Sequence, residues 1–337
     1  MGWLVAASAQ ADTIRIASFN TELARKGPGL LLRDIGKNDP QVTAVQRVIV
    51  RAGGDIVVLQ GIDYDFNGLA ISALRDGIAD LGQEYPHTFA LRPNSGWQTG
   101  IDLDGDGRIG GPRDAQGYGL FSGQGGMAVL SRFPILTDEV VDLSGLLWAQ
   151  QEWAEGPRAP GVLRPQAASV QRLSSVGHWA VPVLLPGGGR ITLLVFHASP
   201  PVFDGPEDRN GYRNADELRL WLAYLDGTVP GARTGPFVIA GDANADMARG
   251  EGRKPALRAL LNDPRLRDPV PVSGSGHADT VIWKQTGPMR VDYILPAADL
   301  PVLAAGVVSP GPEDSFAPVV DQASRHRLVW VDLVLDQ

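Results

Sequence analysis

The sequence predicts a mixed α/β protein built from layers of sheet and helix. Three observations favour this class. Apolar, β-branched runs recur along the chain, helical patterns fall between them, and a Gly- and Pro-rich turn joins at least one pair of runs. Because runs and helical patterns do not alternate regularly, a repeating βαβ array is excluded. The sequence contains no internal repeat.

The expected strands are short apolar runs that end at Gly, Pro, Asp or Asn. They cover residues 14–19, 56–59, 88–91, 126–130, 179–185, 191–196, 237–240, 291–295 and 328–334. The expected helices carry apolar residues at spacings of three and four. They cover residues 41–52, 68–81, 217–225 and 255–261. The turn at 185–190, LPGGGR, predicts a hairpin between two of the runs.

Composition sets limits on both fold and function. The chain has 337 residues, 44% hydrophobic and 20% charged, which is enough for a large core. It has no cysteine, so disulfides, thiolate metal sites and cysteine nucleophiles are excluded. No run reaches the roughly 20 apolar residues of a spanning helix. The net charge of −8 argues against a sequence-independent nucleic-acid binder, because such proteins present a basic field.

We expect a single domain over residues 12–337, with long loop insertions near 92–125 and 144–175. Irregular segments of this length are uncommon in compact domains and usually carry function. Neither segment has the composition of a linker, so both are interpreted as elaborated loops around one end of the core.

The first 11 residues are interpreted as the remnant of a signal peptide. Ala9-Gln10-Ala11 fits the small-x-small rule for cleavage, with Asp12 as the mature start. This interpretation predicts a periplasmic or secreted protein. The alternative is an Ala-rich start with no targeting role.

The loop at residues 102–114 predicts a calcium site. Its alternating carboxylates are Asp102, Asp104 and Asp106. Carboxylates around a glycine-permitted turn suit Ca²⁺, which takes many oxygen ligands. The loop resembles an EF-hand loop, although Arg113 stands at the final Glu position, with Asp114 next to it as a substitute. Since no helical pattern precedes the loop, the expected ion is structural. The alternative is an acidic surface turn.

Polar side chains with catalytic potential stand at the ends of the expected strands. They are Asn20, His197, Asp242, Asn244, Asp292 and His326. An Asp and an Asn on one loop can orient a water and hold a phosphoryl oxygen, and a His–Asp pair can act as acid or base. A second His can stabilise charge, and a divalent metal near Asn20 would neutralise it. Each residue alone has a structural explanation, such as a turn or a core histidine, but together they suit phosphoester hydrolysis.

The order of the motifs resembles that of the endonuclease/exonuclease/phosphatase superfamily, the DNase I-like enzymes. The motifs are Ser18-Phe19-Asn20, Val57-Val58-Leu59-Gln60, Phe196-His197, Gly241-Asp242-Ala243-Asn244, Val291-Asp292-Tyr293-Ile294 and Ser324-Arg325-His326. The resemblance covers residues 14–334 and implies a four-layer α/β sandwich, with two mixed β-sheets face to face and helices outside.

The resemblance also implies a role for each site residue. Asn20 would hold phosphate or metal, and His197 would contact the phosphoryl group or the leaving oxygen. Asp242 would orient or deprotonate the water, and Asn244 would bind a phosphoryl oxygen. Asp292 and His326 would form the acid–base dyad. These roles are assigned from the following matched positions: Asn20, His197, Asp242, Asn244, Asp292 and His326.

Two positions depart from the family pattern. Gly61 stands where the family has its metal-binding Glu, and Arg325 stands where it has Asp before the last His. In one interpretation nearby acids substitute as ligands: Glu22, Asp63 or Asp65. In a second, Arg325 takes part of the metal's role by pairing with phosphate through its planar fork. In a third, the fold remains without catalysis, which the retention of all six site residues argues against.

The sequence therefore predicts an exported, metal-dependent phosphoesterase that uses an activated water. The expected cofactors are a divalent metal at the active site (Mg²⁺, Mn²⁺ or Ca²⁺), with Glu22 and Asp63 as candidate ligands, and a structural Ca²⁺ in the 102–114 loop. The acidic balance and the long loops favour a small-molecule or lipid-like phosphoester over nucleic acid. The alternatives are a non-catalytic, calcium-stabilised binding protein and a secreted nuclease.

Overall fold

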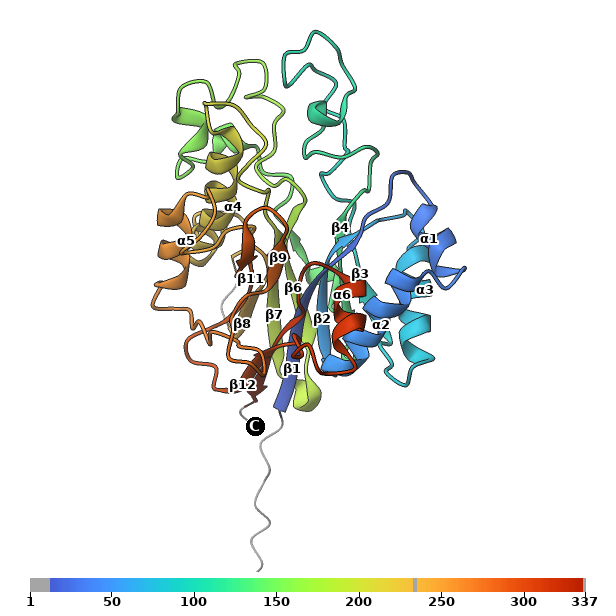
Figure 1. Cartoon of the computed structure of the whole chain (residues 1–337). Helices are drawn as coiled ribbons and strands as arrows, with labels where there is room; N and C mark the ends of the chain where they lie inside the picture. The colour runs from blue at the N-terminus through green and yellow to red at the C-terminus, as the bar shows by residue number, and fades with distance from the viewer. Residues whose placement is uncertain (1–12, 233–234, 336–337) are drawn as a thin grey trace, which may run out of the picture.

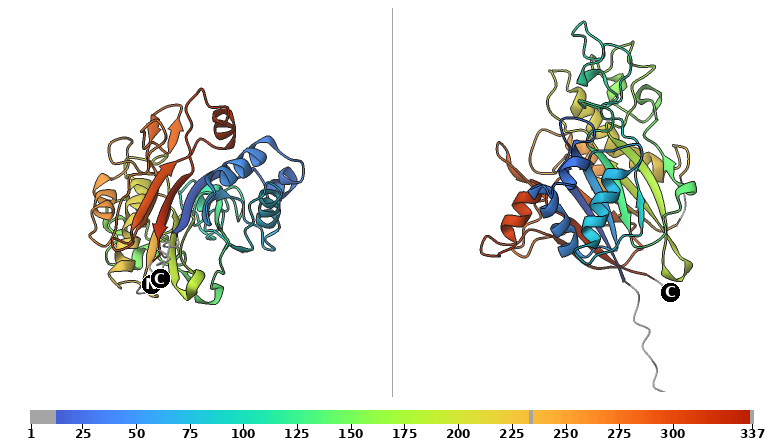
Figure 2. Two further views of the ribbon diagram at one scale, coloured as in Figure 1. Left: turned by 90° about the horizontal axis from the view of Figure 1, so that it is seen from below. Right: turned by 90° about the vertical axis from the view of Figure 1, so that its right-hand side faces the viewer.

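The computed structural model describes residues 13–232 and 235–335. The interpretation of residues 1–11 as a signal-peptide remnant lies outside these residues. Two β-sheets pack face to face and helices cover their outer faces, as Figure 1 and the view from below in Figure 2 show. The expected four-layer α/β sandwich with two mixed sheets is confirmed.

Each sheet contains one parallel pair of strands among antiparallel ones. The larger sheet has the order β12 (Val302–Val307), β13 (Val329–Val334), β1 (Thr13–Leu23), β2 (Ile56–Ile62), β4 (Gly126–Ser131) and β3 (His87–Phe89). The smaller has the order β11 (Asp292–Pro296), β8 (Phe237–Asp242), β7 (Arg190–His197), β6 (Gly177–Leu184) and β5 (Val141–Asp142). A separate hairpin pairs β9 (Val281–Trp283) with β10 (Gly287–Met289).

Apolar side chains from both sheets form the central core. Ile16, Val58 and Val129 of the larger sheet belong to one buried cluster with Val181 and Val195 of the smaller sheet. Because β-branched side chains pack well on a pleated surface, the runs that carry them become the central strands. Burial on both faces also explains why β2 has no exposed residue along its length.

Helices close the two outer faces. The larger sheet is covered by α1 (Leu30–Ile35), α2 (Pro40–Ala52), α3 (Leu69–Ala79) and α6 (Ala317–Ala323). The smaller sheet is covered by α4 (Arg209–Leu225) and α5 (Lys254–Leu261). Five short 3-10 turns lie at Pro112–Asp114, Thr137–Glu139, Trp148–Gln150, Gly156–Arg158 and Pro186–Gly188. None of the helices within residues 13–232 and 235–335 has the length and apolar content to cross a membrane.

All nine expected strands and all four expected helices are present, with shifted ends. The strand expected at 88–91 is His87–Phe89, and the helix expected to begin at residue 217 begins at Arg209. The first half of α4 is polar and buried, so it carries no apolar period that the sequence could reveal. Short or half-exposed elements were missed: α1, α6, β5, β9, β10 and β12.

The two long loops rise from the end of the sandwich at which β7 and β8 finish (Figure 1). They contact each other, since Asn94 Nδ2 donates to the carbonyl oxygens of Ser144 and Ser174, each over 2.8 Å. Arg213 of α4 binds the second loop by donating to the carbonyl oxygen of Leu173 over 2.8 Å. The second loop also packs Trp148, Val162 and Leu173 into the buried apolar cluster beneath α4, so hydrogen bonds and apolar contacts both order it.

Candidate active site

The site residues converge because β7 and β8 end, and β11 begins, at the same edge of the smaller sheet. Asp242, the last residue of β8, is the register partner of both Asp292 on β11 and His197 on β7. Asn20 comes from β1 in the opposite sheet, and His326 lies between α6 and β13. The structure thus brings together residues of both sheets with His326, which is more than 300 positions from Asn20 in sequence.

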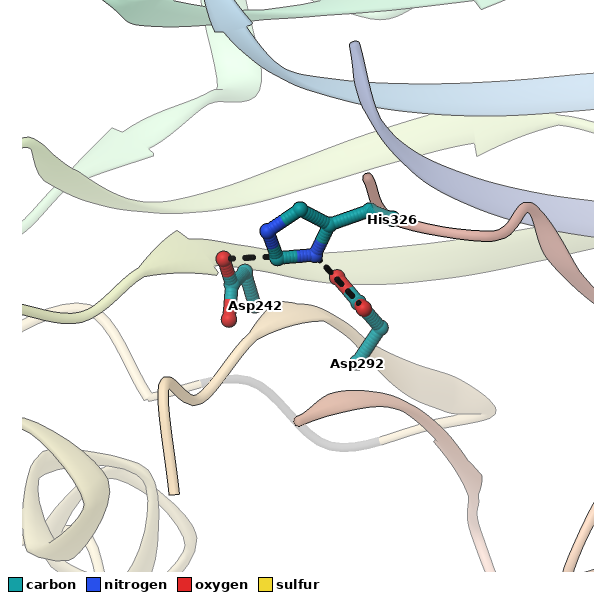
Figure 3. Close-up of side chains that lie close together, drawn as sticks. All are labelled: Asp242, Asp292 and His326. Carbon is teal, nitrogen blue, oxygen red and sulfur yellow. Dashed lines mark hydrogen bonds and ion pairs between the residues drawn. The ribbon is translucent and has the colours of Figure 1, made fainter. Parts of the chain in front are cut away.

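His326, Asp242 and Asp292 form the centre of the site (Figure 3). Nδ1 of His326 lies 2.9 Å from Oδ2 of Asp292 and 4.0 Å from Oδ2 of Asp242. All three side chains are buried. Among the described residues, Oδ1 of Asp292 has no hydrogen-bond partner, so this buried oxygen can still accept a hydrogen bond inside the site.

Asp242 is surrounded by the other expected site residues. Asn20 Nδ2 donates to its Oδ2 over 2.9 Å, and the backbone N–H of Asn244 donates to its Oδ1 over 2.7 Å. His197 Nε2 lies 3.5 Å from Oδ2. Asn244 has a left-handed backbone with φ of 48°, a conformation that Asn tolerates better than most residues. The side chain of Asn244 donates to the carbonyl oxygen of Ala198 over 2.9 Å.

Burial and neighbouring charges set the proton affinity of each group. Burial and the Asp292 carboxylate raise the pKa of Asp242. Burial lowers the pKa of His197, which is therefore neutral at pH 7. Burial also disfavours the charged form of His326, but the Asp292 and Asp242 carboxylates outweigh it and raise the pKa of His326 to about 9. The site thus pairs a carboxylate of increased basicity with a protonated imidazole.

Gly61 is a structural requirement of this site. Its φ is 67°, and a Cβ placed on it would lie 2.4 Å from Oδ1 of Asn20. The Asn20 side chain therefore occupies the space next to Gly61 that any larger residue would need. Both β1 and β2 change register here, between Asn20 and Leu23 and between Gln60 and Ile62.

The acids proposed to replace the missing Glu are engaged with protein donors. Asp63 accepts hydrogen bonds from the backbone N–H groups of Arg25 and Gly125, and burial raises its pKa to about 6. Asp65 accepts from the N–H groups of Leu69 and Ala70 at the start of α3. Both carboxylates hold loops in place, and neither belongs to a group of converging metal donors among the described residues, so their role as metal ligands stays a prediction.

Glu22 lies on the Asn20 side of the site but is bound to Arg325. Its Oε2 accepts from the backbone N–H of Arg325 over 2.8 Å and from Ser324 Oγ over 3.1 Å. Its Oε1 accepts from Nε of Arg325 over 2.8 Å and also from Nη2. Both oxygens of Glu22 thus accept protein donors, and Glu22 belongs to no group of converging metal donors among the described residues, so its role as a metal ligand stays a prediction.

The metal position implied by the resemblance therefore does not fit the residues present. Gly61 offers no ligand, Arg325 brings a positive charge, and the nearby carboxylates are already bonded. A group of donors that could hold an ion does exist at Asp242, Asp292 and His326, whose ligand atoms lie within 4.8 Å of one another. Those side chains are also the candidates for the acid–base chemistry.

The aspartate loop brings its three carboxylates together as expected. Ligand atoms of Asp102, Asp104 and Asp106 lie within 4.8 Å of one another. Asp114 does not join them, because its oxygens accept from the N–H groups of Leu103 and Gly111, over 2.8 and 2.9 Å. The proposed substitute for the final Glu thus has a structural role.

Sequence reasoning missed several residues that shape the site. Ser324 Oγ donates to the carbonyl oxygen of Asn20 over 2.8 Å, and Trp283 of the β9–β10 hairpin packs edge-on against His326 with ring centroids 5.3 Å apart. Asn214 donates to the carbonyl oxygens of Ser199 and Ala243, each over 2.7 Å, and so joins the loops that follow β7 and β8. No local pattern marked these residues, because every contact is distant in sequence.

A four-layer sandwich with this His- and Asp-containing centre at one end defines the DNase I-like class of proteins. The sequence model of the Endonuclease/Exonuclease/phosphatase family matches residues 17–326, and the chain belongs to that family. Members of the family are generally hydrolases of phosphoester bonds, and they typically use divalent metals. A comparison with curated proteins gives no match.

Solved structures share the fold at low sequence identity. A Beutenbergia cavernae endonuclease/exonuclease/phosphatase is 21% identical, with 96% of this chain and 72% of that chain covered and a TM-score of 0.58. A family protein from Bacteroides thetaiotaomicron is 13% identical, with 98% and 97% covered and a TM-score of 0.55. The beta toxin of Staphylococcus aureus is 16% identical, with 94% and 99% covered and a TM-score of 0.55.

Proposed function

We propose that this protein hydrolyses phosphodiester or phosphomonoester bonds by attack of an activated water. The observation that carries the proposal is the buried contact of Asp242 with Asn20 on one side and His326–Asp292 on the other. A basic carboxylate beside a protonated imidazole provides an acceptor and a donor of protons within one site. Membership of a family of phosphoester hydrolases supports the same reaction class.

Each residue has a distinct role in the proposed reaction. Asp242 accepts a proton from the water as its oxygen bonds to phosphorus. The bond from phosphorus to the leaving oxygen breaks, and that oxygen takes a proton from His326. Asp292 holds the imidazolium in place through the 2.9 Å contact. Neutral His197 and the second N–H of the Asn20 amide provide hydrogen bonds for phosphoryl oxygens, and Asn244 joins them when its amide turns from Ala198 to the substrate.

The alternative to a reaction without metal is a divalent ion (Mg²⁺, Mn²⁺ or Ca²⁺) at the converging donors Asp242, Asp292 and His326, which the family's typical use of divalent metals supports. An ion there would neutralise phosphoryl charge. Because those donors also form the proposed acid–base centre, the proposed reaction has no step through an ion, and turnover with each metal is compared with turnover in a chelator.

Three finer proposals complete the function. The acidic net charge of −8 supports a small-molecule or lipid-like phosphoester as substrate rather than duplex DNA. The spacing of Asp102, Asp104 and Asp106 supports a structural Ca²⁺ in the 102–114 loop. The sequence Ala9-Gln10-Ala11 supports export, and sequencing the N-terminus of protein recovered from the periplasm or medium would test it.

Hydrolysis of bis-p-nitrophenyl phosphate and p-nitrophenyl phosphate tests the function. The parent protein is assayed with Mg²⁺, Mn²⁺, Ca²⁺ or EDTA, beside Asp242→Asn and His326→Gln. We expect turnover by the parent and a decrease in kcat of about 10²–10⁴-fold in each variant. No turnover under any condition would favour the non-catalytic binding protein. Turnover undiminished in both variants would contradict the assignment of the site.

A further inference from the structure

We propose that the guanidinium of Arg325 binds the substrate phosphoryl group in place of the metal ion that the family holds on the Asn20 side. The inference rests on the proposed function and specifies how the site neutralises the negative charge of the phosphoryl group. Four features of the structure carry it: the space at Gly61, the bonds of Glu22, the unused donors of Arg325, and the local charge.

The space for the family's metal-binding Glu is filled by another part of the site. A Cβ on Gly61 would lie 2.4 Å from Oδ1 of Asn20 and 3.1 Å from the backbone nitrogen of Glu22. Oδ1 of Asn20 also accepts from that same nitrogen over 3.2 Å. The absence of a carboxylate at Gly61 is thus coupled to the conformation of Asn20 and Glu22, and the three positions form one arrangement.

Glu22 fixes the direction of Arg325. The carboxylate accepts from the backbone N–H of Arg325 and from its Nε, each over 2.8 Å, and also from Nη2. The guanidinium in addition stacks on Trp283, with Cζ 4.4 Å from the ring centroid. Since Trp283 packs against the ring of His326, these contacts place the cation beside the acid–base centre.

Arg325 retains donors for a ligand. Among the described residues Nη1 has no hydrogen-bond partner, and the side chain is 58% exposed. His326, which follows Arg325 directly, is 2% exposed, so the chain passes from solvent to the buried centre within one residue. A planar guanidinium with unused N–H groups at the mouth of a site matches the geometry of a phosphoryl oxygen.

The two departures bring positive charge to the site without an ion. In the family pattern both positions carry carboxylates, with a total charge of −2. Here Gly61 and Arg325 stand at those positions, so their total charge is +1. Glu22 pairs with the guanidinium from the protein side.

Titration with inorganic phosphate tests the inference without catalysis. Protein freed of metal with EDTA is titrated by calorimetry, for the parent and for Arg325→Ala and Arg325→Lys. We expect phosphate to bind the metal-free parent, and Arg325→Ala to weaken binding about tenfold or more, because a charge-assisted pair is lost. Arg325→Lys should bind with intermediate affinity, since it keeps the charge but not the fork.

Arg132→Ala is the matched control for this titration. Arg132 has a comparable exposure of 55% and pairs with Asp55, but it follows β4 at the opposite end of the sheet. Its substitution should leave phosphate affinity unchanged. Phosphate binding that requires an added divalent ion, or that is equal in the parent and Arg325→Ala, would overturn the inference.

Turnover provides the second measurement. We expect the EDTA-treated parent to keep kcat within about twofold of its value with Mg²⁺, and Arg325→Ala to lose roughly 10²-fold in both conditions. Loss of turnover in EDTA with recovery in Mg²⁺ would overturn the inference while the proposed function stands. If no condition gives turnover, the proposed function fails, and the phosphate titration alone decides the role of Arg325.

Discussion

Asn20 on β1 donates a hydrogen bond to Asp242 on β8, with 2.9 Å between Nδ2 and Oδ2. The two residues belong to different sheets, so this contact joins the halves of the sandwich at the reactive carboxylate. The position of Asp242 therefore depends on how the sheets pack, and the proton affinity of Asp242 depends on a residue 222 positions away.

Asn20→Ala should move the acidic limb of activity to higher pH. Burial and Asp292 raise the pKa of Asp242, whereas the hydrogen bond from Asn20 lowers it. Removal of that bond raises the pKa further, so the basic form of Asp242 appears only at higher pH. The profile of kcat/KM against pH measures the shift. Asn67→Ala, on an exposed loop, is the control, and equal profiles for both variants would contradict this role.

Asp292→Asn should move the alkaline limb to lower pH. Burial lowers the pKa of His326, but Asp292 and the other carboxylates raise it to about 9, so the imidazole of the parent loses its proton only near that pH. Without the Asp292 charge the pKa of His326 is lower, so the imidazole loses its proton at a lower pH and activity declines there. The profile of kcat against pH tests this, and an unchanged alkaline limb would exclude His326 as the acid.

The same pKa shift predicts a change of stability with pH. The pKa of His326 is higher in the folded protein than its ordinary value of 6.5, so the stabilisation is fully present below pH 6.5. It declines as pH rises toward about 9. Urea denaturation at several pH values should show that the free energy of unfolding declines over this range in the parent and not in His326→Gln. If the free energy of unfolding changes with pH in the same way in both proteins, the raised pKa of His326 is contradicted.

Gly61→Ala should lower activity by displacing Asn20. The added Cβ would meet Oδ1 of Asn20 at 2.4 Å on a backbone with φ of 67°. We expect kcat to fall about tenfold or more because the contact with Asp242 is lost. Gly53→Ala is the matched control, since Gly53 has φ of 63° and no atom within 4 Å of the added Cβ. Equal kcat values for both variants would contradict the role of Gly61.

The fold could be predicted, and the six candidate site residues could be singled out, because their sequence signals are local. An apolar run followed by Gly241-Asp242-Ala243-Asn244 marks a buried strand and its reactive end without reference to any other segment. The contacts around Gly61 and Arg325, the two departures from the family pattern, could not be predicted this way. Asp63 lies near Gly61 in sequence, but its carboxylate accepts from the backbone N–H groups of Arg25 and Gly125, 38 and 62 positions away.

Residues that support the site from behind gave no sequence signal. Glu217 sits in the polar half of α4, where apolar periodicity is absent, and its partners Ser175 and Ser199 lie 42 and 18 positions away. Trp283 lies in a hairpin of two three-residue strands, too short for a strand pattern. Spacing predicts which residues share a face of one element, whereas these contacts depend on how separate elements meet.

Glu217→Gln should destabilise the fold. The buried carboxylate accepts from the N–H and hydroxyl groups of Ser175 and Ser199, over 2.5 to 2.8 Å. A carboxamide replaces one acceptor by a donor that faces N–H groups, and the unsatisfied donors cost on the order of 3 kcal/mol. Denaturation with urea measures the change. The exposed Glu152→Gln is the control, and a loss as small as in that control would contradict the prediction.

Removal of calcium should lower the thermal stability of the 102–114 loop region. Asp102, Asp104 and Asp106 place three carboxylates within 4.8 Å of one another, and their mutual repulsion is relieved when Ca²⁺ binds. We expect EDTA to lower the Tm of the parent and excess Ca²⁺ to restore it. The size of the change depends on the Ca²⁺ concentration relative to the Kd of the site. In a variant with Asp104→Asn and Asp106→Asn, Tm should no longer respond to Ca²⁺. The test needs a parent preparation that is shown to contain bound Ca²⁺. If EDTA leaves the Tm of that preparation unchanged, a structural ion in this loop is excluded.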